Sequence, residues 1–206
     1  IGSGKHVRED FLGFGFSGMS LAAALAAIVA RADRREPFAY VATPNVDHAV
    51  GLAREPARAA LYNDAWLTLN DSRVLEALAH FSGRDLPAAP GADLVARLFE
   101  EEIAPREPVV LVGGDTSMIE ALAARYDLKN IRWHRAPMNL KHDPNAIAEA
   151  AEFVAANPAR FVFFCVGAPQ QEMIAWAAAL RGDAIGVGIC CGASLNFLAG
   201  LSRRAP

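Results

Sequence analysis

The chain has 206 residues, of which 53% are hydrophobic and 21% are charged, and its net charge is −3 with histidine neutral. This composition is typical of a globular protein and excludes a disordered one. Acidic and basic residues are mixed along the chain, so we expect no nucleic-acid partner, because non-specific binding to DNA or RNA needs a basic face.

Short apolar runs alternate with alanine-rich helical segments. In chain order, the pattern predicts strands at residues 38–42, 65–69, 109–112, 131–134, 161–166 and 184–187. It predicts helices from about residue 46 and at residues 73–81, 117–126, 144–156 and 170–180. The strands are continuously apolar, as buried parallel strands are. The fold class is therefore α/β, with a Rossmann-like parallel sheet flanked by helices.

We expect one domain over residues 10–206, built from two α/β halves at roughly 10–104 and 105–206 that share one active-site cleft. Residues 1–6 are interpreted as a remnant of expression. The alanine-rich residues 21–30 are too short to span a bilayer and do not form a signal peptide, because Arg31 follows the apolar segment. The cysteines (Cys165, Cys190 and Cys191) indicate core residues in a reducing compartment.

The loops at the carboxyl ends of the predicted strands are rich in polar groups. Ligands bind at this edge of an open parallel sheet. These groups hydrogen-bond hydroxyls and phosphates and include few metal ligands, which suits a sugar nucleotide. No DxD pair, HExxH motif or P-loop occurs, so we expect no metal and no cofactor. The residues at the strand ends are Thr43, Asn45, Asp47, Asn70, Asp71, Gly113, Gly114, Asp115, Gly167, Gln170 and Gln171.

Each of these features also has a purely structural interpretation. The glycines at 113 and 114 bring backbone N–H groups to a helix start, which suits a diphosphate, but a tight turn needs them equally. Asp71 is placed to take a proton from a hydroxyl, yet Asp71 or Ser72 would also cap the next helix. Gln171 either faces the strand ends or begins a solvent-facing helix, and His48 is more often a structural residue than a chemical one.

An ordered set of motifs runs from about residue 10 to the end of the chain. Residues 43–48 (T-P-N-V-D-H), 112–114 (V-G-G) and 167–172 (G-A-P-Q-Q-E) each follow a predicted strand. Residues 70–72 (N-D-S) and 91–94 (G-A-D-L) lie between the first two. The closing segment has glycines at 186, 188 and 200 and ends in R-A-P. Together, these motifs resemble the WecG/TagA/CpsF family, glycosyltransferase family 26.

The resemblance implies an inverting, metal-independent transfer from a UDP-sugar to a polyprenyl-diphosphate-linked glycan in envelope or exopolysaccharide synthesis. It places the enzyme in the cytoplasm, peripheral to the inner face of the plasma membrane. Asp71 takes the position of the general base. The implied substrate-binding positions are Thr43, Asn45, Asn70, Asp93, Gly113, Gly114, Asp115 and Gln171.

The sequence departs from the family pattern at three places. Residues 70–72 replace P-D-G, and residues 86–90 lack the arginine that usually precedes G-x-D-L. Family members continue past R-A-P with a basic, aromatic, membrane-associating segment, so we expect a truncated and weakly active form. A non-catalytic sugar-nucleotide-binding protein is the alternative. A nucleotide-cofactor oxidoreductase is disfavoured because residues 43–45 are not glycine-rich. Self-association stays open, since an exposed sheet edge favours it.

Overall fold

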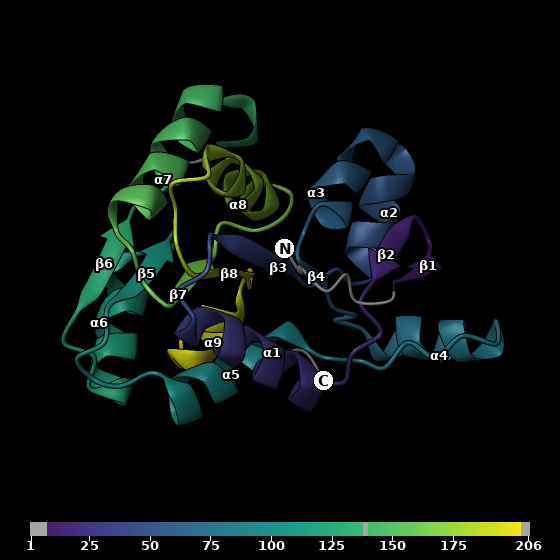
Figure 1. Ribbon diagram of the computed structural model, residues 1–206, viewed down its shortest axis with the longest axis horizontal. Helices are drawn as coiled ribbons and strands as arrows, with labels where there is room; N and C mark the ends of the chain where they lie inside the picture. Colours follow the sequence, from purple (N-terminus) through teal and green to yellow (C-terminus); the bar gives the residue numbers. More distant parts are fainter. Residues whose placement is uncertain (1–7, 138–139, 203–206) are drawn as a thin grey trace.

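The protein is described by a computed structural model over residues 8–137 and 140–202 (Figure 1). It is an α/β fold with a Rossmann-like parallel sheet between two layers of helices, so the predicted fold class is confirmed. The interpretations of residues 1–6 and of the closing R-A-P concern residues outside the described ranges.

The main sheet has six strands in the order β4-β3-β8-β7-β5-β6, and every pairing is parallel. All residues of β5, β7 and β8 are buried, which explains their continuously apolar sequences. Strand β8 pairs with β3 on one side and β7 on the other, so it connects the strands of residues 10–104 to the other strands of residues 105–206. The strands are β3 (Ala39–Ala42), β4 (Leu67–Thr68), β5 (Val109–Val112), β6 (Ile131–His134), β7 (Phe161–Phe164) and β8 (Val187–Cys190).

Alternate residues of the strands face two separate hydrophobic clusters. Val162 and Phe164 of β7 pack into one cluster, and Phe161 and Phe163 pack into the other. One face is covered by α2 (Val46–Arg54), α3 (Ala59–Asn63), α7 (Pro144–Ala156) and α8 (Gln170–Arg181). The other is covered by α1 (Leu21–Asp33), α5 (Gly91–Arg97), α6 (Thr116–Tyr126) and α9 (Ser194–Leu198) (Figure 1). Short turns complete the chain at η1 (Pro56–Arg58), η2 (Leu98–Glu102, a π-helix) and η3 (Leu140–His142).

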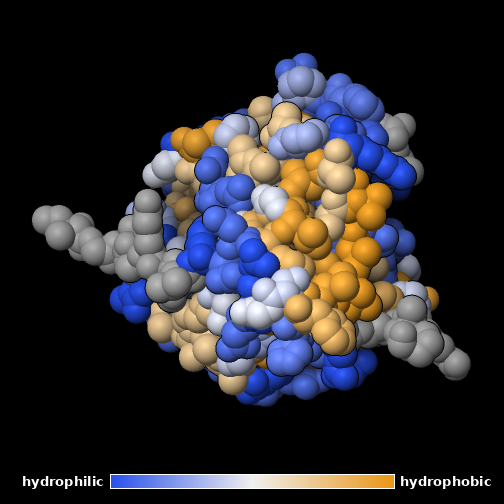
Figure 2. Space-filling view, turned by 90° about the vertical axis from the view of Figure 1, so that its right-hand side faces the viewer, coloured by the Kyte–Doolittle hydropathy of each residue, from blue (hydrophilic) through white to orange (hydrophobic). Residues whose placement is uncertain are grey.

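The sequence pattern did not predict the first elements of the chain. An antiparallel hairpin of β1 (Glu9–Phe11) and β2 (Phe14–Phe16) precedes α1, with Phe14 and Phe16 fully buried. Helix α4 (Arg73–Phe81) projects from the molecule on the same side (Figure 1). Figure 2 shows hydrophobic surface on this side. Its exposed large apolar side chains are Leu12, Val46, Val50, Val74, Leu78 and Phe81.

The predicted last strand at residues 184–187 is wrong in position, because β8 occupies Val187–Cys190. Gly186 has a φ of 104° and lies in a turn so tight that a Cβ would approach the Ala159 carbonyl oxygen to 2.0 Å. Ile185 forms only an isolated antiparallel bridge with Pro37. The chain therefore turns into the sheet at Gly186, and the four strand residues follow it.

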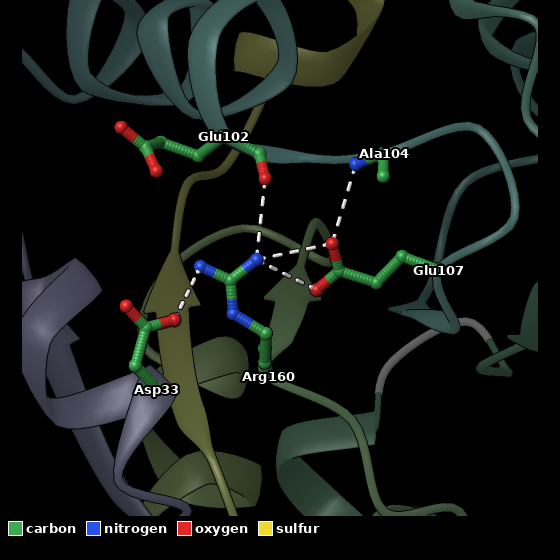
Figure 3. Close-up of polar contacts among 5 residues, drawn as sticks. All are labelled: Asp33, Glu102, Ala104, Glu107 and Arg160. Atoms are coloured by element: carbon green, nitrogen blue, oxygen red, sulfur yellow. Dashed lines mark hydrogen bonds and ion pairs between the residues drawn. The ribbon is translucent and has the colours of Figure 1, made fainter.

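The amino-terminal edge of the sheet is held by Arg160, which directly precedes β7 (Figure 3). Its guanidinium pairs with Asp33 at the end of α1 at 2.7 Å and with Glu107 at 3.1 Å. It also donates to the Glu102 carbonyl oxygen at 3.2 Å. Glu107 in turn accepts the Ala104 N–H at 3.2 Å. This network ties α1, η2 and β7 together at the edge opposite the polar loops.

Candidate functional site

A cavity of about 300 Å³ opens at the carboxyl ends of the strands. It brings together segments that are far apart in the sequence: the loops after β3, β4 and β8, and the first turns of α5 and α8. Its lining residues are Thr43, Asn45, His48, Asp71, Ala92, Ala168, Gln171, Cys191, Gly192, Ala193, Ser194 and Phe197.

The loop after β3 places Thr43 and Asn45 on this cavity. The buried Thr43 hydroxyl donates to the Cys190 carbonyl oxygen at 3.0 Å, which links the ends of β3 and β8. Asn45 caps α2 through its Oδ1, which accepts the N–H groups of Asp47 at 3.0 Å and His48 at 3.4 Å. Burial lowers the pKa of His48, so its imidazole is neutral near pH 7. Both loop residues are therefore held in place by the backbone before any ligand binds.

Asn70, Asp71 and Ser72 follow β4 and have three different roles. Ser72 caps α4 by accepting the Leu75 N–H at 3.2 Å, so the capping role that the sequence left open belongs to Ser72. Asn70 is buried, donates to the Leu86 carbonyl oxygen at 3.3 Å and accepts the Ser72 N–H at 3.0 Å. We therefore assign Asn70 to holding this loop. Asp71 lines the cavity.

The Asp71 carboxylate is oriented by the start of α5. Its Oδ1 accepts the Gly91 N–H at 3.0 Å, and its own N–H donates to the Pro44 carbonyl oxygen at 3.0 Å. A Cβ on Gly91 would lie 3.0 Å from the Thr43 hydroxyl oxygen, so glycine allows α5 to approach this closely. Asp93 lies in the first turn of the same helix, beside the cavity-lining Ala92.

Gln171 and Glu172 are buried in the first turn of α8, with 4% and 0% of their surface exposed. The interpretation of this turn as a solvent-facing helix start is therefore wrong. The Gln171 amide donates to Glu172 Oε1 at 2.8 Å and accepts the Gly192 N–H at 2.8 Å. Burial raises the pKa of the Glu172 carboxyl to about 7.

Gly113 and Gly114 lie on a second cavity of about 410 Å³, with Lys141 and Gln170 on its wall. Their φ angles are 97° and 74°, a region that favours glycine. A Cβ would come within 2.4 Å of Val166 at Gly113 and within 2.1 Å of Met118 at Gly114. The left-handed backbone of this turn thus needs glycine whether or not a ligand binds, and the sequence could not separate this need from ligand binding.

Asp115 follows the glycines and caps α6. It accepts the Ser117 hydroxyl at 2.6 Å and the Met118 N–H at 2.9 Å, and these two hydrogen bonds lower its pKa. Asp115 is exposed, and its contacts here account for a capping role.

Ala168 and Pro169 each line several neighbouring cavities. Ala168 borders the cavity of Asp71, the cavity of Gly113 and a smaller one that contains Arg58. Pro169 also lines a mainly apolar cavity of about 660 Å³ between α3, α7 and α8, with Arg58 and Lys141 among its lining residues. These two residues therefore link neighbouring cavities at the carboxyl ends of the strands, where the sequence predicts one shared cleft.

Sequence reasoning missed several residues of these cavities. The small residues 191–194 gave a signal, since a run of Cys-Gly-Ala-Ser after a buried strand allows a ligand to approach the backbone. Arg58 and Lys141 gave none, because each lies outside the motifs and reaches the cavities only through the fold.

Over residues 8–137 and 140–202, no group of three or more His, Cys, Asp or Glu side chains is arranged to hold a metal ion. Within the same ranges, no helix combines the length and apolarity needed to cross a bilayer.

Comparison with known proteins agrees with this geometry. The sequence model of the glycosyl transferase WecG/TagA/CpsF family matches residues 9–206, which is nearly the whole chain. No curated protein sequence matches it. The family match favours a transferase over the oxidoreductase alternative. The chain therefore belongs to the WecG/TagA/CpsF family and is a glycosyltransferase of cell-envelope polymer synthesis.

Proposed function

We propose that the protein transfers a hexose or N-acetylhexosamine from a UDP-sugar to a polyprenyl-diphosphate-linked glycan, with inversion at the anomeric carbon. The observation that carries this proposal is the shared cavity of Asp71, Thr43, Asn45 and Gln171 in a chain of this family. One carboxylate beside several neutral hydrogen-bonding groups suits an uncharged sugar. We place the reaction at the inner face of the plasma membrane, where UDP-sugars and lipid-linked acceptors meet.

Asp71 is the proposed general base. Its carboxylate takes the proton of the acceptor hydroxyl while that oxygen bonds to the anomeric carbon from the face opposite the leaving group. The bond between the anomeric carbon and the diphosphate oxygen breaks, and UDP leaves with the electron pair. The Gly91 N–H supports this role because it fixes one oxygen of the carboxylate at 3.0 Å. Such a positioned base accelerates a reaction by about 10²- to 10⁴-fold.

We assign the nucleotide diphosphate to the second cavity. Its wall contains the glycine turn that precedes α6, where the helix dipole favours negative charge. Lys141 on the same wall adds a full positive charge. Ala168 separates this cavity from that of Asp71, so a sugar attached to the diphosphate reaches the carboxylate across one residue.

We assign the lipid-linked acceptor to the apolar cavity between α3 and α8. Its lining combines apolar groups such as Leu61, Ile147 and Trp176 with the cations Arg58 and Lys141. An isoprenoid diphosphate has the same two parts, an apolar chain and an anionic head. Salt-dependent binding of the head group would follow from these cations.

The test is transfer by the purified protein from a panel of UDP-sugars to a polyprenyl-diphosphate-linked acceptor, comparing the wild type with Asp71→Asn. The variant keeps an oxygen for the Gly91 N–H and loses the base, so we expect a fall in kcat of about 10²-fold or more with UDP binding retained. Asp127→Asn is the matched control, because Asp127 is exposed and its left-handed conformation suits asparagine.

Three outcomes contradict parts of this proposal. An unchanged kcat in Asp71→Asn removes Asp71 as the base. Binding of UDP-sugars without transfer by the wild type supports the non-catalytic alternative. Absence of UDP binding by calorimetry removes the donor assignment.

A further inference from the structure

A fully buried carboxyl group lies behind the cavity of Asp71. Glu172 has no exposed surface, and its Oε1 accepts one N–H of the Gln171 amide at 2.8 Å. Its Oε2 is buried and has no hydrogen-bond partner among the described residues. Burying an incompletely hydrogen-bonded carboxyl group costs stability, so its presence needs an explanation beyond packing.

The groups around Glu172 do not neutralise it. Helix α8 packs against β3, β8, α3, α7 and the short turn η3, whose Lys141 and His142 side chains are exposed. The titratable groups of β3, α3 and β8 that act on Glu172 are the Tyr40 hydroxyl, the Tyr62 hydroxyl and the Cys190 thiol. Burial raises the pKa of each group, so all three are neutral. The acidic side chains of α7, Glu149 and Glu152, lie on its exposed surface. This environment therefore does not support a role for Glu172 as the partner of a buried cation.

The hydrogen bonds of Gln171 fix the orientation of its amide. The Gly192 N–H can only donate, so it must meet the amide oxygen, and it does so at 2.8 Å. The Glu172 oxygen at the other end accepts, so it must meet the amide nitrogen. A flipped amide would lose both bonds. The Gly192 N–H and the Glu172 acceptor thus favour the same amide orientation, in which Glu172 holds the amide nitrogen and the amide oxygen anchors Gly192.

Gly192 belongs to the loop between β8 and α9, which forms one wall of the cavity together with Ala193 and Ser194. Gly192 has a φ of 51°, a left-handed conformation that glycine adopts readily, and its N–H is held by the Gln171 amide oxygen. Asp71 lies on another part of the same cavity. The position of this wall relative to Asp71 decides where the sugar can lie.

We propose that Glu172 is a positioning residue, which acts through Gln171 on Gly192 and so fixes the wall of the cavity that holds the reacting sugar. The amide nitrogen carries two hydrogens, and the one not given to Glu172 supplies a donor for a sugar oxygen. The catalytic consequence rests on the proposed transferase activity. The relay of hydrogen bonds from Glu172 through Gln171 to Gly192 is independent of that activity.

Two variants separate this role from simple packing. Glu172→Gln keeps a carbonyl oxygen that accepts from Gln171, and Glu172→Met fills a similar volume without an acceptor. We expect Glu172→Gln to keep kcat within about threefold, and Glu172→Met to lose about tenfold to a hundredfold at retained fold, as for a misplaced reacting group. Glu120→Met, on the exposed face of α6, is the control and should match the wild type.

The spectroscopic measurement follows the relay directly. In ¹⁵N-labelled protein, the side-chain amide of Gln171, assigned by its loss in Gln171→Met, and the backbone amide of Gly192 should both shift in Glu172→Met. The Gly192 amide should also exchange its hydrogen faster. In Glu172→Gln, both signals should stay close to their wild-type positions.

Unmoved Gln171 and Gly192 signals in a folded Glu172→Met protein overturn the proposal. If Glu172→Met does not fold, Glu172→Gln decides: retained kcat and signals support the acceptor role, and a loss beyond tenfold in a folded protein overturns it. If the wild type shows no transfer but the signals shift as expected, the proposed function fails and the positioning relay stands.

Discussion

The backbone N–H of Gly91 donates to Asp71 Oδ1 at 3.0 Å, and this bond joins the start of α5 to the loop after β4. The same glycine approaches Thr43 so closely that a Cβ would lie 3.0 Å from the threonine hydroxyl oxygen. Gly91 therefore supports two residues of the candidate site at once, one through its N–H and one through its missing side chain.

Gly91→Ala should lower activity even though alanine favours helices. The new methyl group has to displace the Thr43 side chain or α5, and either movement changes the position of Asp71. We expect kcat to fall by about tenfold, as for a small misplacement of a reacting group. Steady-state kinetics with donor and acceptor varied separately measure this effect.

The control for Gly91→Ala is Gly51→Ala in the middle of α2, where a Cβ would meet, among the described residues and within 4 Å, just the Arg58 side chain at 3.9 Å. This variant should stabilise the protein by about 0.5–1 kcal/mol, the usual gain of alanine over glycine inside a helix. If Gly91→Ala gains the same stability and keeps full activity, the close approach of Gly91 to Thr43 is not needed for catalysis.

Stability should depend on pH through Glu172. Its pKa is about 7 in the folded protein against an ordinary value of 4.5, so the folded state binds the proton more tightly than the unfolded state. The stabilisation is complete below about pH 4.5 and is lost as the pH rises to about 7, with a total of about 3 kcal/mol. The Glu172→Gln protein lacks this ionisation, so its free energy of unfolding should not show this part of the decrease with rising pH.

Urea unfolding of both proteins at intervals from pH 5 to pH 8 tests this expectation. The free energy of unfolding of Glu172→Gln, relative to that of the wild type, should rise over this range and level off near pH 8. Parallel curves for the two proteins would show that Glu172 titrates normally.

Arg160→Met should destabilise the protein and leave catalysis intact. It removes the links to Asp33 and to the Glu102 carbonyl oxygen, and it leaves Glu107, only 12% exposed, without its cation (Figure 3). Because Arg160 is itself partly exposed, solvent screens these bonds, so we expect a loss of about 1–2 kcal/mol. Thermal unfolding measures it, and salt should reduce the difference between the two proteins.

Catalysis should be unaffected because this network lies at the opposite edge of the sheet from Asp71. A lower kcat for Arg160→Met, measured well below its unfolding temperature, would mean that the two edges of the sheet are coupled.

Parts of the fold were predictable because local sequence determined them. The strands at Val109–Val112 and Ile131–His134 and the helices at Arg73–Phe81 and Pro144–Ala156 have the predicted bounds. An apolar run marks Val109–Val112, whereas Ile131–His134 contains an arginine and a histidine and gives a weaker signal. The caps Ser72 and Asp143 mark the helix starts. The hairpin of β1 and β2 was missed because three-residue strands show no periodicity.

The site was less predictable, because its roles depend on tertiary contacts. Asn70, Asp71 and Ser72 all carry side chains suited to capping or binding, and only the fold distributes a loop contact, a cavity position and a helix cap among them. Burial of Glu172 was equally hidden, since the packing of α8 against β3 and β8 decides which side of its first turn faces inward.

The shared wall at Ala168 has a consequence for inhibitor design. The cavities of about 410 and 300 Å³ lie on either side of this alanine, so a single compound can occupy both by crossing its small side chain. When a diphosphate mimic and a sugar mimic are linked, binding of the first makes binding of the second intramolecular, so the linked compound binds much more tightly than either fragment. Enlarging residue 168 would block such a bridge and, under the proposed donor assignment, would obstruct the donor as well.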